Sequence, residues 1–293
     1  MSTATVTQKR PVRQAGGKRK TTPFEWLVFL LLIVIAVIMI FPTLNMFSTA
    51  FKSQAEVLKF PPKLIPEQFA WGNFKNLFTQ YQYGLWYKNS LLIAFFSVIG
   101  TVLSSSLVAF GFARYNARGK NVLFLFLLST MMIPYPALMI PQFILFKNLG
   151  WMDTILPITV PAFFGSAYNI FLIRQFFASL SGELYDAAKI DGCSEWRQWW
   201  NIALPLSGPV LATVAIFGFM YSWNDLLGQV LYLNSSEHFT LTIGMTAMYS
   251  SATRLVPWNL VMLSAVLALV PILVLFSVAQ KYFVESIVLT GVK

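Results

Sequence analysis

The sequence predicts an all-α integral membrane protein with six transmembrane helices. Its 293 residues are 57% hydrophobic and only 11% charged, and the mean hydropathy is +0.64. Soluble domains carry roughly 25% charged residues, so a chain this apolar is suited to a bilayer rather than to water. Six apolar runs are each close to the roughly 20 residues that a helix needs to cross the hydrocarbon core.

These six runs follow one another along the chain. The first is unbroken from Trp26 to Phe41, and the second contains no charged residue. The third is interrupted by Pro134, Pro136 and Pro141, which remove helix hydrogen bonds and bend the backbone. The expected spans cover residues 26–47, 90–113, 122–146, 154–177, 206–223 and 258–276, and the last run extends toward residue 282.

Small residues in the second span favour close packing against another helix. Gly100 and Ser104 lie four residues apart, and so do Ser105 and Ala109. Residues at this spacing share one helix face. Small side chains on that face let two helices approach closely in a membrane.

The first run follows a basic segment that has no apolar periodicity. We expect residues 1–25 to form a disordered cytoplasmic tail. The basic leader and the small residues Ser48, Thr49 and Ala50 also fit a cleaved signal peptide. The apolar run exceeds the 7–15 residues typical of a signal core, so retention is the stronger interpretation, and cleavage leaves the later topology unchanged.

The distribution of Lys and Arg predicts the orientation. With a cytoplasmic N-terminus, 14 of the 21 basic residues lie inside and seven outside. This bias follows the positive-inside rule and predicts that both termini are cytoplasmic. The outer count is raised by one long loop, residues 48–88, where the rule is weaker.

Composition excludes several classes of function. The net charge of +10 comes from residues that flank apolar segments, which indicates a topology signal rather than nucleic-acid binding. A single cysteine, Cys193, and a single histidine, His238, allow no internal disulfide and no Cys/His metal cluster. We therefore expect no catalytic residue, no metal site and no cofactor bound by this chain.

Two other membrane functions remain as alternatives. An ion-driven secondary transporter requires ionisable residues inside its spans, and the apolar cores of the first, second, third and sixth spans contain none. A membrane-embedded enzyme requires a polar catalytic cluster, but only isolated polar residues occur. Both alternatives are less favoured than a transport subunit that is driven from outside the chain.

The connection between the fourth and fifth spans carries the strongest functional signal. It holds four of the eleven acidic residues and is also rich in Trp and Ala. Ser181 and Ser194 are each placed to cap a short helix, Gly192 permits a left-handed turn between them, and Pro205 opens the next span. An amphipathic linker on the membrane is the alternative; it explains the tryptophans but not the acids, which an anionic leaflet repels.

The order of residues in this connection resembles the EAA loop of bacterial binding-protein-dependent ABC importers. That loop reads E-A-A, three residues, G, nine residues and I-x-L-P. Asp186-Ala187-Ala188, Gly192 and Ile202-x-Leu204-Pro205 match it at the same spacing. Asp186 stands where the family usually has Glu, and Cys193 replaces a frequent Ala.

Other segments extend the resemblance to most of residues 25–293. They are Met131-Met132-Ile133-Pro134, Trp223-Asn224-Asp225, Leu241-Thr242-Ile243-Gly244, residues 280–284 and residues 290–293. Together they are similar to the carbohydrate-uptake permeases typified by MalG. The resemblance implies the MetI-like fold of type I ABC importer permeases. It divides the chain into a first helix and outer loop (26–88), a transmembrane domain (89–282) with a coupling loop (181–205), and a cytoplasmic C-terminal tail (283–293).

The resemblance also implies partners and a cargo. It places the chain in the bacterial cytoplasmic (inner) membrane, as one half of a channel that imports a di- or oligosaccharide. Glycerol phosphate or a polyol is the alternative cargo. Its partners are a second, MalF-like permease subunit, two MalK-like ATPase subunits and an external solute-binding protein. ATP and Mg belong to the ATPases, because this chain has no G-x-x-x-x-G-K-[ST] phosphate loop.

Two groups of residues follow as candidate sites. The resemblance assigns ATPase coupling to Glu183, Asp186, Ala187, Ala188, Asp191, Gly192, Ile202, Leu204 and Pro205. Asn224 and Asp225, at the end of the fifth span, are candidates for the translocation path. The alternative for this pair is an end-cap at the membrane interface.

Overall fold

The computed structural model describes residues 22–250 and 255–290, the last ten by their backbone alone. The described residues form helices and connecting turns, without a strand among them. They divide into two compact units, 1–45 and 46–293. Most of the expected basic tail and the last three residues lie outside the described ranges.

The first unit consists of most of α1 (Pro23–Ala50), a helix of 28 residues. Its apolar side chains from Trp26 to Phe41 are exposed. An apolar helix of this length suits a lipid environment. The helix continues past Pro42, so the predicted first span is three residues short at each end.

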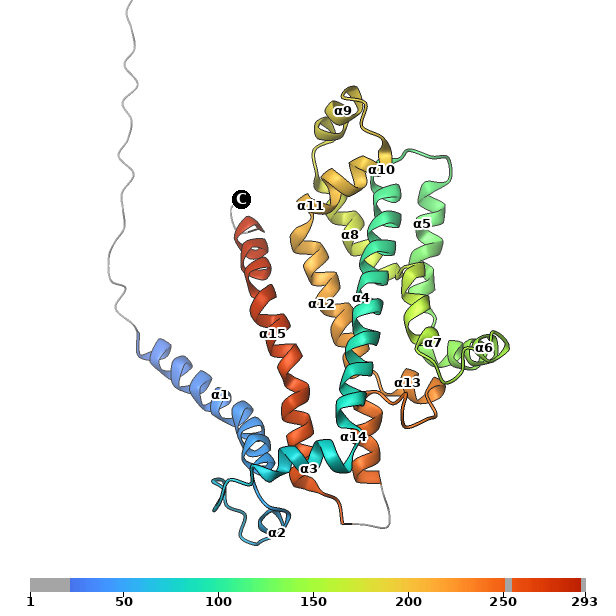
Figure 1. The fold of residues 1–293 in the computed structure, drawn as a ribbon. Helices are drawn as coiled ribbons and strands as arrows, with labels where there is room; N and C mark the ends of the chain where they lie inside the picture. The colour runs from blue at the N-terminus through green and yellow to red at the C-terminus, as the bar shows by residue number, and fades with distance from the viewer. Residues whose placement is uncertain (1–21, 251–254, 291–293) are drawn as a thin grey trace, which may run out of the picture. The chain divides into compact units, whose positions relative to one another are not determined.

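The second unit is organised around α4 (Tyr83–Arg114), which has 32 residues. It packs against α8 (Ala167–Ser179) and α12 (Gly208–Asn224) (Figure 1). Gly100 provides space for Phe163, whose ring would come within 2.6 Å of an added Cβ. The Ser104 hydroxyl also lies 3.1 Å from the Ala162 carbonyl oxygen, so the predicted close approach is confirmed at Gly100 and Ser104.

The third predicted span is broken rather than bent. It consists of α5 (Lys120–Ser129), η1 (Thr130–Met132) and α6 (Tyr135–Asn148), and its two halves meet at 96°. Ile133 is extended (φ −78°, ψ 116°), as the residue before a proline prefers. The sequence predicted an interruption here, and the structure shows it as a break between two helices rather than as a bend within one.

The remaining spans also depart from simple rods. The fourth consists of α7 (Leu156–Thr159), η2 (Val160–Phe164) and α8, with Gly165 between the last two at φ +85°. The fifth, α12, meets the helical segment before it at 83°. The sixth, α15 (Trp258–Thr290), runs through Pro271 and extends well beyond the predicted end. Within residues 22–250 and 255–290, four helices are long and apolar enough to span a membrane, or six if each bent pair counts as one.

The connection between α1 and α4 contains α2 (Gln54–Val57) and α3 (Gly72–Gln80). Asn73 is the buried residue that fastens α3. Its amide nitrogen donates to the carbonyl oxygens of Ala50 (2.8 Å) and Lys52 (2.9 Å), and its amide oxygen accepts from Asn259 (3.0 Å). The predicted outer loop is thus partly helical and is bound to the start of α15.

Two apolar clusters lie at opposite ends of α4. One contains Tyr83 and Trp86 with residues of α15 and of α14 (Leu241–Ser250). The other contains Phe110 of α4, Phe177 of α8 and Val214 of α12. The helix therefore joins two separately packed regions.

A substitution at Gly244 tests the first cluster. An added Cβ would lie 2.1 Å from Cε3 of Trp86, and this indole is held by a hydrogen bond from its Nε1 to the Ser236 carbonyl oxygen (3.2 Å). We expect Gly244→Ala to destabilise the solubilised protein by about 1–3 kcal/mol, the usual cost of overpacking. The measurement is the midpoint of thermal loss of the monodisperse protein.

Gly111→Ala is the matched control, because no atom lies within 4 Å of its added Cβ. It should leave the midpoint unchanged or raise it, since Ala favours a helix over Gly. An equal loss in both variants would contradict the packing argument.

Candidate functional site

The predicted connection between the fourth and fifth spans forms four short helical segments. They are α9 (Gly182–Ile190), α10 (Glu195–Gln198), η3 (Trp199–Ala203) and α11 (Leu204–Leu206). Figure 1 shows α9 and α10 at one end of α4, opposite α3. Ser194 caps α10, with its hydroxyl accepting from the N–H of Arg197 (3.4 Å). Ser181 precedes α9, but its side chain makes no capping bond, so that expectation is wrong.

Gly192 ends α9 in the left-handed conformation, at φ +74°. The N–H of Gly192 donates to the carbonyl of Lys189 (3.1 Å), and that of Cys193 donates to Ala188 (2.9 Å). These two bonds form a Schellman motif, in which a glycine avoids the steric cost that other residues meet. The turn that the sequence predicted at this position is confirmed.

α9 has one anchored face and one free face. Tyr185 is buried against α4, with the Arg114 guanidinium 3.8 Å from its ring centroid and the Phe110 ring 6.0 Å away. The free face presents exposed residues at the spacing of one helix stripe. These are Glu183, Asp186, Ala187 and Ile190, the last 87% exposed.

The nine predicted coupling residues therefore fall into two groups. Beyond the free face, Asp191 and Gly192 are exposed and Ala188 is half-buried. Ile202 and Leu204 instead pack against the cluster that contains Tyr185 and Trp199, and Pro205 is exposed on α11. Tyr185 was missed by the sequence analysis, although it is the one aromatic residue in a short helix of otherwise smaller or charged side chains.

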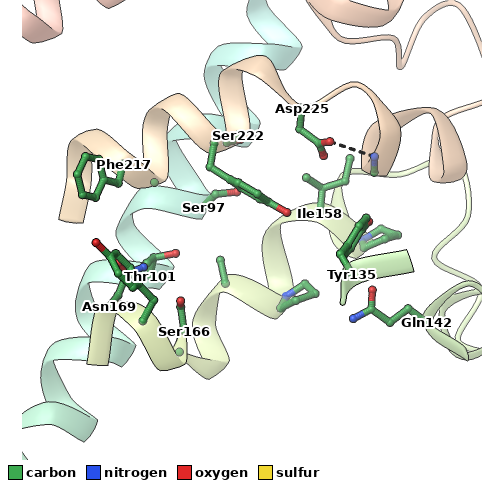
Figure 2. Close-up of a pocket in the computed structure, with 18 of the residues that line it drawn as sticks. Ser97, Thr101, Tyr135, Gln142, Ile158, Ser166, Asn169, Phe217, Ser222 and Asp225 are labelled. Atoms are coloured by element: carbon green, nitrogen blue, oxygen red, sulfur yellow. Dashed lines mark hydrogen bonds between the residues drawn. The ribbon is translucent and has the colours of Figure 1, made fainter. Parts of the chain in front are cut away.

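A cavity of about 600 Å³ lies between α4, α6, the α7–α8 segment, α12 and α13 (Leu227–Tyr232). Figure 2 shows polar side chains entering it from several of these elements. The polar residues that line it are Ser97, Thr101, Tyr135, Gln142, Ser166, Tyr168, Asn169, Tyr221, Ser222, Asp225 and Tyr232. Except for Asp225, none of them was predicted from the sequence, because they come from separate segments of the chain and match no motif.

The two residues proposed for the translocation path are placed differently. Asp225 lines the cavity, and its Oδ1 accepts a hydrogen bond from the N–H of Gly228 (3.0 Å), which caps α13 (Figure 2). Asn224 is exposed and outside the cavity lining, and its amide donates to the carbonyl of Met220 (2.8 Å). Asp225 therefore both caps α13 and forms part of the cavity wall.

Buried polar contacts hold the turn that carries Asp225. The amide nitrogen of Gln229 donates to the carbonyl of Ser222 (2.8 Å), and its oxygen accepts from the hydroxyls of Thr240 and Thr242. The Thr242 hydroxyl also lies 2.9 Å from the Asp225 carbonyl oxygen. These bonds fix α13 against the end of α12 and the start of α14.

Asp153 joins two loops near the same wall. It has φ +59°, and its carboxylate accepts from the backbone N–H groups of Asn234 and Ser235 (both 2.9 Å) and from the Ser235 hydroxyl. The Nδ1 of His238 lies 3.2 Å from Oδ1 of Asp153. Partial burial by itself raises the pKa of Asp153. The hydrogen bonds from Ser235 and Asn234 lower the pKa by a larger amount, so the pKa falls well below its usual range.

Comparisons with known proteins agree on one family. The family profile described as "Binding-protein-dependent transport system inner membrane component" matches residues 100–288. The arabinooligosaccharide permease AraQ of Halalkalibacterium halodurans is 36% identical over 94% of this chain and 99% of its own. The sn-glycerol-3-phosphate permease UgpE of Yersinia pestis is 31% identical over 88% of this chain and 94% of its own.

Two solved structures share the fold. A chain of a bacterial ABC transporter involved in importing the acidic polysaccharide alginate is 24% identical, with a TM-score of 0.81 over 89% of this chain and 96% of its own. A chain from an alginate transporter in complex with its pentasaccharide-bound periplasmic protein is 16% identical, with a TM-score of 0.62 over 88% of this chain and 94% of its own.

The anchoring role of Tyr185 is testable by amide hydrogen exchange. Truncating a buried aromatic side chain costs about 3–5 kcal/mol, so Tyr185→Ala should speed exchange across residues 182–190 by at least about tenfold. Tyr185→Phe should leave exchange near that of the parent, because the Tyr185 hydroxyl has no hydrogen-bond partner among the described residues. Unchanged exchange in Tyr185→Ala would show that α9 is held elsewhere.

Proposed function

Because this chain belongs to the binding-protein-dependent transport system inner membrane components, we propose that it is one permease subunit of an ATP-driven carbohydrate importer. The observation that carries the proposal is the free face of α9. A short helix exposes two carboxylates, an alanine and an apolar side chain at the place where the family docks its ATPase. An amphipathic linker that rested on lipid would turn Ile190 toward the membrane and keep acids away from it.

The packing beneath α9 offers a route for motion. Tyr185 shares a cluster with Phe110, Phe177 and Val214. These residues belong to α4, α8 and α12, and the same three helices line the cavity. A displacement of α9 by a partner therefore acts directly on the helices around the cavity, since packed interiors transmit strain.

The cargo follows from the relatives and from the cavity. The names of related permeases specify arabinooligosaccharides, diacetylchitobiose and sn-glycerol 3-phosphate. The cavity combines hydroxyl and amide side chains with four tyrosines. Polar groups that fix orientation among aromatic walls are typical of small-molecule sites and suit a carbohydrate. Glycerol phosphate or a polyol is the second candidate.

The remaining parts of the importer are proposed from the family. Two ATPase subunits supply ATP and Mg, a second permease subunit completes the channel, and an external solute-binding protein delivers the cargo. The chain lies in the bacterial cytoplasmic membrane with α9 and both termini inside. In this proposal the chain itself is not an enzyme, because ATP hydrolysis is carried out by the ATPase subunits.

Substitutions in α9 test the coupling. Gly192→Pro removes a bonded N–H and imposes a φ near −65° where the chain has +74°. Asp186→Lys reverses a charge on the free face. Both should lower ATP-dependent solute uptake at least about tenfold and weaken ATPase co-purification. Gly192→Pro loses the turn that ends α9, and Asp186→Lys loses a charged contact with the ATPase.

Gly182→Pro is the matched control. Gly182 is the first residue of α9, where proline is well tolerated, and Ser181 before it is already extended at ψ 132°. Uptake should be retained in this variant. Near-normal uptake in Gly192→Pro and Asp186→Lys would leave α9 as a membrane-surface linker.

The orientation has its own test. Single cysteines at positions 10, 70 and 235 are introduced in a Cys193→Ser background and treated with an impermeant thiol reagent in intact cells. We expect labelling at 70 and 235 and none at 10, because the positive-inside rule places the basic tail in the cytoplasm. The reverse pattern would invert the proposed topology.

A further inference from the structure

The cavity contains an unusual number of polar atoms without partners. Four of its lining residues have a side-chain polar atom that is buried and makes no hydrogen bond within the described part of the chain. These atoms are Ser97 Oγ, Asn169 Oδ1, Ser222 Oγ and Tyr232 Oη, and each residue is more than nine-tenths buried. Most buried polar atoms in proteins are hydrogen-bonded, so such a group calls for an explanation.

These four atoms come from four different helices around one space. Ser97 lies on α4, Asn169 on α8, Ser222 on α12 and Tyr232 on α13. All four are hydroxyl or amide groups, which donate to and accept from uncharged polar ligands. Because all four residues line the cavity, hydroxyl and amide side chains from four helices surround any molecule that occupies it.

Asp225 provides the single carboxylate of the lining. Within the described residues only its Oδ1 accepts a hydrogen bond, from Gly228. Oδ2 remains available beside the Tyr135 hydroxyl, since a Cβ at Gly228 would meet Oδ2 at 2.5 Å and the Tyr135 hydroxyl at 3.0 Å. A carboxylate oxygen forms strong, charge-assisted hydrogen bonds with hydroxyl donors.

The lining offers no full positive charge. It includes no Lys or Arg among the residues that the structure describes. Arg174, on the same helix as Asn169, lies over the Phe124 ring at 4.3 Å and outside the lining. The N-terminus of α8 begins at the cavity wall after Ser166, but its partial charge of about +0.5 is smaller than that of one carboxylate.

We infer that this cavity selects uncharged, polyhydroxylated carbohydrates and rejects phosphorylated and uronic ones, with Asp225 as the residue that sets the charge preference. The inference rests on the proposed function and narrows its cargo. It separates this chain from permeases that are named for sn-glycerol 3-phosphate, because a phosphate here would face a carboxylate without a paired cation.

The first experiment measures the charge preference without any cargo. A Tyr221→Cys, Cys193→Ser chain in open membrane fragments has one thiol at the cavity, since Tyr221 is 71% exposed and lines it. It reacts with two methanethiosulfonates that differ in carrying a trimethylammonium or a sulfonate group. With rates normalised to a small free thiol, the cationic reagent should react at least about tenfold faster.

Adding Asp225→Asn should reduce this ratio to about twofold or less, since the carboxylate supplies the field. Glu237→Gln is the matched control, because Glu237 is an exposed acid outside the cavity, and it should leave the ratio unchanged. Equal rates for both reagents in the parent, a faster anionic reagent, or an unchanged ratio in Asp225→Asn would overturn the inference.

The second experiment uses the complete importer in its own cells. Uptake of arabinotriose and maltotriose is compared with that of glycerol 3-phosphate and trigalacturonate. Neutral sugars should be imported and the two anions should not. Asp225→Asn should lower neutral uptake at least about tenfold at equal membrane abundance, whereas Asn224→Ala, outside the cavity, should not.

The two experiments fail separately. Import of glycerol 3-phosphate or trigalacturonate without neutral sugars would overturn the charge preference and leave the importer standing. An absence of ATP-dependent import for every solute would remove the proposed function, and the reagent ratio would still decide the charge preference of the cavity.

Discussion

The contact between Tyr185 and the end of α4 joins α9 to a helix that also lines the cavity. The Tyr185 ring packs against both the Phe110 ring and the Arg114 guanidinium of α4, so α9 is attached to a long transmembrane helix. Thr101 on that helix lines the cavity. The 13 residues from Thr101 to Arg114 span about 20 Å at the rise of an α-helix. A rigid helix is a physical connection over that distance, because its hydrogen bonds resist bending between the two points.

The breaks in the helices are found where the cavity is. The third span turns by 96° before Tyr135, and the fourth changes from η2 to α8 at Gly165. Both residues line the cavity. A bilayer tolerates non-helical backbone only where protein or a polar cavity can satisfy its N–H and C=O groups. The proline and the glycine therefore open a space among the helices as well as ending them.

Local chemistry determined how much of this could be predicted. Gly192 was identifiable because a glycine between two short polar helices has one common use, and its φ of +74° agrees. The angle at Pro134 was not, since a proline permits either a kink or a full break, and neighbouring helices decide between them. Likewise α15 continues through Pro271, although a proline often ends a helix in water.

The cavity was the part that the sequence could not reveal. Ser97, Asn169 and Tyr232 are separated by long stretches of chain, and their spacing follows no motif. Only tertiary packing brings them to one space. A single polar residue in a membrane helix can equally serve helix packing, so none of the three by itself indicated a cavity. Asp225 was detectable because a carboxylate at the end of a span is energetically unfavourable, and ionisable residues in such places are commonly functional.

Asp225 also shows why two interpretations of one residue need not compete. As a cap, its Oδ1 accepts from Gly228, and the buried Gln229 contacts hold the same turn. A carboxylate fixed in this way loses little further freedom when a ligand arrives, which is the advantage of a preorganised group. The structural bond therefore holds the carboxylate in place at the cavity wall. The end-cap that the sequence suggested as the plain alternative is therefore compatible with a place for the same carboxylate in the cavity wall.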